Sequence, residues 1–270
     1  MNLWRRLPYS AGGKPPARRR KTMLLTTATG ETRLVPAVLD IAMSVRAISA
    51  AILFVVTLAA YELVMNEMFY IYNPAVVGNQ RVPASEIVAA SQIETLHVLW
   101  LQPDRAALSL LQRMPELQTA YVGCALPAEC TIQVAERAPL FEWKQSQTRT
   151  WIDAEGIAFP ARGQTPAILV IEVAPDVPAL LPGKTVSRDL MTTVTELIRV
   201  LPEVKTFRFT TVRGIEFTDP QNHWTVYVGV GSDIAARVSM WKAVSANLAA
   251  RNVRAKFVDV RYPQAPFYGK

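Results

Sequence analysis

Apolar positions follow two different patterns along this chain. From Ala47 to Tyr61 fifteen consecutive residues carry no charge, whereas beyond about residue 66 apolar residues recur in short runs typical of strands and amphipathic helices. An α-helix rises about 1.5 Å per residue, so a helix over 43–65 would cross the hydrocarbon core of a bilayer, which is about 30 Å thick. We therefore predict one apolar helix followed by a folded region of short elements.

The folded region is predicted to be an α+β structure. Alternating apolar and polar residues predict strands, and apolar residues at helical spacing predict helices. The predicted helices cover 83–91, 103–113, 187–201 and 233–248, and Ser187 and Asp233 are the expected N-caps of the last two. The predicted strands cover 118–124, 130–137, 140–144, 207–217, 223–230 and 255–262, and two strand ends flank a turn within 151–159.

Nearly all of the net charge precedes the apolar stretch. Residues 1–46 contain nine Lys or Arg and two acidic residues, which gives +7, while the rest of the chain holds twenty of each sign. Such an excess marks the cytoplasmic side of a span. We predict a single-pass protein of the cytoplasmic membrane, with a basic cytoplasmic tail at 1–42, a transmembrane helix at 43–65 and everything after about residue 66 outside.

Other interpretations of these two segments stay open. The apolar run could be the core of a cleaved signal peptide, although its charged leader is unusually long, or the core helix of a soluble protein, which would not explain the charge step. The tail is rich in Pro, Gly, Ser and Thr up to Thr32, and we expect it to be disordered. Such a tail could touch acidic lipid headgroups or nucleic acid, but a basic run is more often only the topology signal, and no nucleic-acid partner is expected.

The two cysteines of the chain, Cys124 and Cys130, are disulfide candidates. A hairpin turning near Pro127 would place them opposite one another, and a disulfide can persist outside the cytoplasm. The same register would pair Val122 with Ile132. The alternative is two reduced thiols in a small core.

The sequence offers little support for catalysis. His97 and His223 fall in different predicted domains, and neither has metal-ligand spacing with Cys or carboxylates. A Ser-x-x-Lys from Ser239 to Lys242 lies in mid-helix and lacks the companion motifs of the enzymes that use it. We therefore expect no catalytic residues, no metal and no cofactor.

The order of motifs resembles the FtsQ/DivIB family of cell-division proteins. Residues 72–83 read YNPAVVGNQRVP and residues 131–139 read TIQVAERAP, which is similar to the strand, Gly-Asn turn, helix and final V-x-E-R-x-P of the family's POTRA module. Trp143 and the WIDAEGIAF of 151–159 match the entry into its second, β-rich domain. The VDVRY of 258–262 resembles its last strand.

The resemblance implies a POTRA domain at 69–138 and an FtsQ-type β-domain with flanking helices at 139–270. It implies a division-septum scaffold that binds small bitopic coiled-coil proteins of the FtsB and FtsL type and links them to septal cell-wall synthesis. Alternatives are a POTRA-bearing protein-transport chaperone and a membrane-anchored cell-wall enzyme. Glu136 and Arg137, at a strand end, could orient a partner or form a solvated rim.

The C-terminal strand is the predicted partner-binding site. A terminal strand often lies at a sheet edge, where its unpaired N–H and C=O groups can accept a strand from a partner. The residues expected to contribute are Val258, Val260, Arg261, Tyr262, Phe267 and Tyr268. The alternative is that Tyr262 and the tail only seal the domain's own core.

Overall fold

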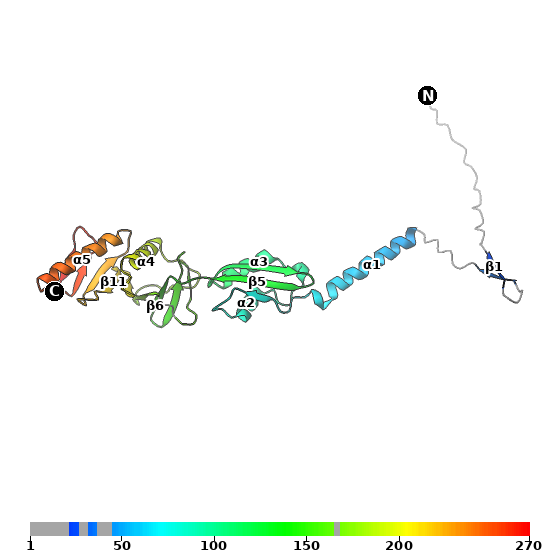
Figure 1. The fold of residues 1–270 in the computed structure, drawn as a ribbon, viewed down its shortest axis with the longest axis horizontal. Helices are drawn as coiled ribbons and strands as arrows, with labels where there is room; N and C mark the ends of the chain where they lie inside the picture. The colour runs from blue at the N-terminus through cyan, green and yellow to red at the C-terminus, as the bar shows by residue number, and fades with distance from the viewer. Residues whose placement is uncertain (1–21, 27–31, 37–44, 165–167) are drawn as a thin grey trace, which may run out of the picture. The chain divides into compact units, whose positions relative to one another are not determined.

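The computed structural model describes residues 22–26, 32–36, 45–164 and 168–270 (Figure 1). The chain divides into two units, 1–63 and 64–270. In the first unit, β1 (Thr22–Thr26) pairs antiparallel with β2 (Thr32–Pro36). The disorder expected up to Thr32 is therefore wrong for β1, which forms a paired strand. Apart from these two strands, the residues expected in the tail lie outside the described ranges.

The apolar stretch forms one helix, α1 (Val45–Met65). Its 21 residues span roughly 31 Å at about 1.5 Å per residue, which matches a hydrocarbon core of about 30 Å. None of its residues is buried by the rest of the chain, as a soluble core helix would be. The hydroxyls of Ser49 and Thr57 donate to the carbonyls of Val45 and Leu53, which satisfies them within the helix. Among the described residues, α1 is the one helix long and apolar enough to cross a membrane.

The first part of the second unit is a small sheet covered by two helices. The elements are η1 (Glu67–Phe69), β3 (Ala75–Val77), α2 (Ala84–Ser91), η2 (Val98–Trp100), α3 (Pro103–Arg113), β4 (Leu117–Ala125) and β5 (Glu129–Glu136). The strand order is β3-β5-β4, with β3 parallel and β4 antiparallel to β5. Ile87 of α2, Leu110 of α3 and Ile132 of β5 are fully buried in one shared core.

The remainder is a sheet of nine strands in the order β14-β13-β12-β11-β10-β9-β6-β7-β8. The strands are β6 (Phe141–Gln145), β7 (Thr148–Ile152), β8 (Ala158–Pro160), β9 (Leu169–Val173), β10 (Thr206–Thr210), β11 (Gly214–Thr218), β12 (Thr225–Gly229), β13 (Phe257–Asp259) and β14 (Phe267–Gly269). Two helices, α4 (Arg188–Val200) and α5 (Ile234–Ala250), share its core, where Trp241 of α5 lies edge-on to Phe217 of β11.

Several predicted elements are confirmed, and three predictions of strands and caps need correction. The strand predicted at 207–217 is two strands, because the chain reverses at 211–213 and Thr210 pairs with Gly214. The strand predicted at 255–262 keeps only 257–259, and β14 was not foreseen. Ser187 caps α4 as expected, but Asp233 makes no capping bond to α5 and pairs with Arg237 instead.

Glu136 and Arg137 are engaged within the chain, so neither forms a solvated rim. The Glu136 carboxylate accepts the N–H groups of Gln80, Arg81 and Val82 at 2.7, 2.8 and 2.9 Å. This fastens the loop before α2 to the end of β5.

Arg137 joins the two sheets of the second unit. Its Nη1 lies 2.6 Å from Asp153 and 2.7 Å from Glu155, beyond β7. Arg162 makes a second bridge, to Glu86 at 2.8 Å and Glu116 at 2.9 Å. The large sheet is therefore held against the small one by two arginines, each shared between two carboxylates.

Candidate functional site

The predicted edge strand lies inside the sheet. β13 pairs in parallel with β12 on one side and antiparallel with β14 on the other. Val258 and Val260 are fully buried in the core. The expectation that these two side chains serve a partner is thus wrong, because both face the core of the large sheet. The edge of β13 is also closed, because the chain turns after Tyr262 and β14 pairs with it.

The open edge belongs to β14. The N–H of Val260 and the carbonyl of Lys256 form hydrogen bonds with β12. Backbone groups of successive strand residues point to opposite sides, so those of Phe257 and Asp259 point toward β14. Tyr268 lies between the register partners of those two residues. Its N–H and C=O therefore point away from β13. One residue of β14 thus presents both groups to an incoming strand.

An aromatic row runs across the outer strands, on the face away from α4 and α5. The rings of Tyr227 and Phe257 lie 5.4 Å apart, and those of Phe257 and Phe267 lie 6.0 Å apart and edge to face. Gly269 makes room for this row, because a Cβ there would stand 2.3 Å from Cε1 of Phe257. The row is therefore set by a glycine in the last strand.

Three side chains at this edge are open to solvent. Tyr262, Phe267 and Tyr268 are 67%, 49% and 43% exposed. Large exposed aromatic side chains are the usual anchors of protein interfaces. Phe267 and Tyr268 are neighbours on β14 and so point to opposite faces of the sheet, while Tyr262 lies in the loop before this strand. The structure thus leaves these three predicted residues exposed and buries Val258 and Val260.

A groove of about 340 Å³ opens beside Tyr262. Its lining includes Arg213, Arg237 and Arg261. Arg237 lies 2.6 Å from Asp233, and Arg261 lies 2.7 Å from Asp259, whose side-chain hydrogen bond raises the pKa of the Arg261 guanidinium.

Arg213 adds a positive charge to the groove. It donates to the Tyr227 hydroxyl at 2.9 Å and lies 4.6 Å from the centre of that ring. The groove is therefore basic. The sequence did not reveal Arg213 and Arg237 as groove residues, because only the folded sheet brings them close to Arg261. Tyr227 could have been found from the alternation of apolar and polar residues within 223–230.

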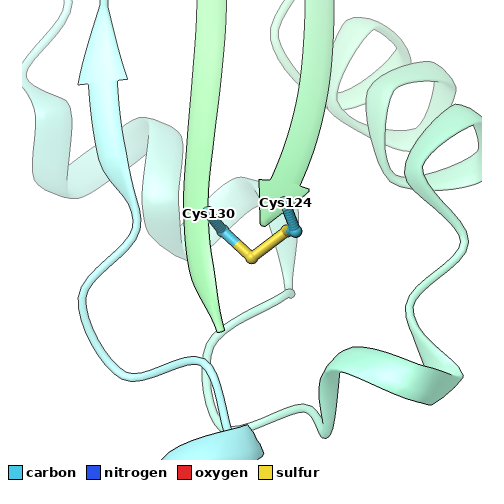
Figure 2. The surroundings of a disulfide bond; sticks show 2 residues. All are labelled: Cys124 and Cys130. Carbon is cyan, nitrogen blue, oxygen red and sulfur yellow. A yellow bond between two sulfur atoms is a disulfide. The ribbon is translucent and has the colours of Figure 1, made fainter. Parts of the chain in front are cut away.

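The structure joins Cys124 and Cys130 in a disulfide at the end of the β4–β5 hairpin (Figure 2). The predicted register is confirmed, with Cys124 opposite Cys130 and Val122 opposite Ile132. Cys130 is buried in the core of the small sheet. The bond therefore closes the tip of this hairpin and lies apart from the aromatic row.

The two histidines do not share a site. His97 is buried among Phe69, Tyr70 and Trp100, whereas His223 lies in the turn before β12. Within the described residues, no three His, Cys, Asp or Glu side chains gather in a way that could hold a metal ion.

Comparison with known proteins shows which proteins part of this chain resembles. Residues 75–137 match the model of the POTRA domain, FtsQ-type. The chain is also similar to proteins named Cell division protein FtsQ from Chloroflexus aurantiacus and Chloroflexus aggregans, each 27% identical over 159 residues. The chain therefore carries an FtsQ-type POTRA domain and is similar to FtsQ proteins of cell division. The resemblance drawn from the sequence motifs is confirmed.

The aligned region covers 58% of this chain and 58% of each FtsQ relative. The POTRA match coincides with the small sheet and its two helices, from the start of β3 to the residue after β5. One apolar helix ahead of an FtsQ-type domain indicates a single-pass membrane protein.

Proposed function

We propose that this protein is a scaffold of the bacterial division machinery that binds other division proteins outside the cytoplasmic membrane and links them to septal cell-wall synthesis. The proposal rests on its FtsQ-type POTRA domain and on an open sheet edge with three exposed aromatic side chains. Its role is to hold proteins together, and no catalytic step is assigned to it. The orientation follows from the charge step, with the basic tail in the cytoplasm and residues 66–270 outside.

The partners are FtsB-like and FtsL-like bitopic coiled-coil proteins. A segment of such a partner adds to β14 as a short strand, pairing with the N–H and C=O of Tyr268. Because so few backbone groups are open, the side chains of Tyr262, Phe267 and Tyr268 supply most of the affinity. An acidic residue of the partner suits the basic groove beside Tyr262.

The test separates the backbone contact from the side chain. Tyr268→Pro removes the outward N–H together with the ring, and an edge strand tolerates proline at such a position. Tyr268→Ala keeps the N–H and removes the ring. Leu181→Ala is the matched control, because Leu181 is 60% exposed in the loop that pairs with β8 at the opposite edge.

Binding of the purified FtsB-like protein of the same organism is measured with each variant of the full chain. We expect Tyr268→Ala to weaken binding at least tenfold, which corresponds to about 1.4 kcal/mol, Tyr268→Pro to weaken it further through the lost N–H, and Leu181→Ala to leave it unchanged. Unchanged binding by Tyr268→Pro and by a Tyr262→Ala, Phe267→Ala double variant would show that the partner docks elsewhere.

A further inference from the structure

A cluster of exposed apolar side chains follows directly after α1. Met68, Leu96, Leu99 and Trp100 are 56%, 40%, 48% and 69% exposed. Phe69 is half-buried beside them. We call these five residues the juxtamembrane cluster. Trp100 is distinctive, since the other four tryptophans in the described residues are all buried.

The cluster is built on two short 3₁₀ helices that are fixed to one another. The N–H of Ile71 donates to the carbonyl of Leu96 at 2.9 Å, and Tyr70 forms an antiparallel bridge with His97. The buried His97 ring lies 6.0 Å from Phe69 and 6.4 Å from Trp100. Segments that are 30 residues apart in sequence therefore present one continuous apolar surface.

Chain connectivity limits how far this surface can be from the end of α1. Met65 is the last residue of the helix, and Asn66 caps the next turn by accepting the N–H of Met68 at 3.0 Å. Three residues reach at most about 11 Å even when fully extended. The headgroup region adds roughly 5–8 Å beyond each side of the hydrocarbon core. If α1 fills that core, Met68 stays within or just beyond the headgroups.

We infer that the juxtamembrane cluster inserts into the headgroup region of the membrane that α1 crosses, and thereby holds the POTRA domain against the bilayer surface. Tryptophan favours this interface because its large apolar ring carries a polar N–H that can stay hydrated. The inference rests on α1 being a membrane span.

The charges nearby decide the kind of lipid contact. Segments 66–70 and 94–100 contain Glu67 and Glu94 and no Lys or Arg. These two segments therefore offer no positive charge to anionic headgroups, and their carboxylates would be repelled. The cluster engages the neutral part of the interface, so a zwitterionic phosphatidylcholine bilayer suffices.

The experiment uses the full chain in phosphatidylcholine nanodiscs, one copy per disc. Tryptophan emission is compared in ordinary lipid and in lipid brominated near the glycerol end of its acyl chains, which quenches rings at the interface. Whether the chain stays in the discs first shows whether α1 inserts in the bilayer. A chain that stays in the discs without quenching would therefore contradict the docking of the cluster but not the membrane span. Trp100→Phe removes the ring in question, and thermal unfolding of each variant checks that it folds.

We expect bromolipid to quench wild-type emission and Trp100→Phe to lose that quenched component. With Trp100 kept, a Met68→Ser, Leu99→Ser double variant should lose most of the quenching. Leu108→Ser is the matched control, because Leu108 is 60% exposed on α3 outside the cluster, and it should quench as wild type. Replacing part of the lipid with an anionic one should not increase quenching.

Quenching that is the same with and without Trp100 would overturn the inference. The inference would also be overturned if Trp100 emission shifted only after another membrane protein was added to the disc. The cluster would then be a docking surface for a protein. Failure of the chain to remain in discs would refute the membrane span and the docking together.

Discussion

Glu136→Gln tests how the loop before α2 is held. The Glu136 carboxylate is almost buried, and it accepts three backbone N–H groups and the Nε of Arg81 at 2.9 Å. Burial alone would raise the pKa of Glu136, but the hydrogen bonds from Val82, Gln80 and Arg81 outweigh it and lower the pKa to about 2. A fall from the ordinary value of 4.5 corresponds to a stabilisation on the order of 3 kcal/mol by the ionised form.

The direction with pH follows from the lowered pKa. The stabilisation is complete above pH 4.5, where the carboxylate is ionised in both states, and it is lost as the pH falls toward about 2. Glutamine keeps an acceptor for the backbone groups and removes the charge. Glu136→Gln should therefore lower the free energy of unfolding by on the order of 3 kcal/mol at neutral pH, and by almost nothing near the folded-state pKa.

The assay is urea unfolding of the full chain in detergent, followed by tryptophan fluorescence across this pH range. Glu172→Gln is the control, because Glu172 is 54% exposed and 3.5 Å from Lys144, and such surface pairs contribute at most about 1 kcal/mol. A loss for Glu136→Gln that does not change with pH, or that is no larger than the loss for Glu172→Gln, would refute the reasoning.

Three further outcomes are expected. Mass spectrometry of the non-reduced exported protein should find Cys124 linked to Cys130, and loss of this short loop should cost roughly 2 kcal/mol; two alkylatable thiols would contradict the pairing. A reporter that is active only outside the cytoplasm should be active when fused after Lys270, whereas activity of a cytoplasmic reporter there would contradict the orientation. Gly78→Ala should lower the melting temperature, because φ is +94° and the new Cβ would lie 2.1 Å from the carbonyl oxygen of Val134; an unchanged transition would show that the loop relaxes freely.

Local patterns predicted the first half of the fold well. The alternation on both sides of Pro127 sets the β4–β5 register, because a slip of one residue would turn the buried Val122 and Ile132 outward. In the second half, the apolar spacing and the cap at Ser187 also placed one helix, α4, within one residue. These features depend on neighbours in sequence, which a single sequence contains.

The second half depends on partners that are distant in sequence. β14 has three residues after Pro266, too few to show alternation, and it exists because it pairs with β13. The turn between β10 and β11 has one local sequence signal, Gly214, which adopts a φ of 73°. This glycine alone did not divide the predicted strand, because the apolar pattern continues on both sides of it. The true sheet edge and the basic groove could not be predicted for the same reason.

The role of Arg137 was also beyond the sequence. Its position after Glu136 at a strand end suggested a solvated rim, but Asp153 and Glu155 come to it from the large sheet. Choosing among the carboxylates of the chain requires knowing how the two sheets pack. The motif that contains Arg137 still contributed to the resemblance to FtsQ proteins, because that resemblance depends on the order of several motifs and not on the partner of a single charge.

Depletion of this protein in its source organism tests the proposed role in division most directly. The account predicts that cells continue to elongate without completing septa and form filaments, and that expression of the wild-type chain restores division while Tyr268→Pro does not. Normal septation after complete depletion would contradict the account.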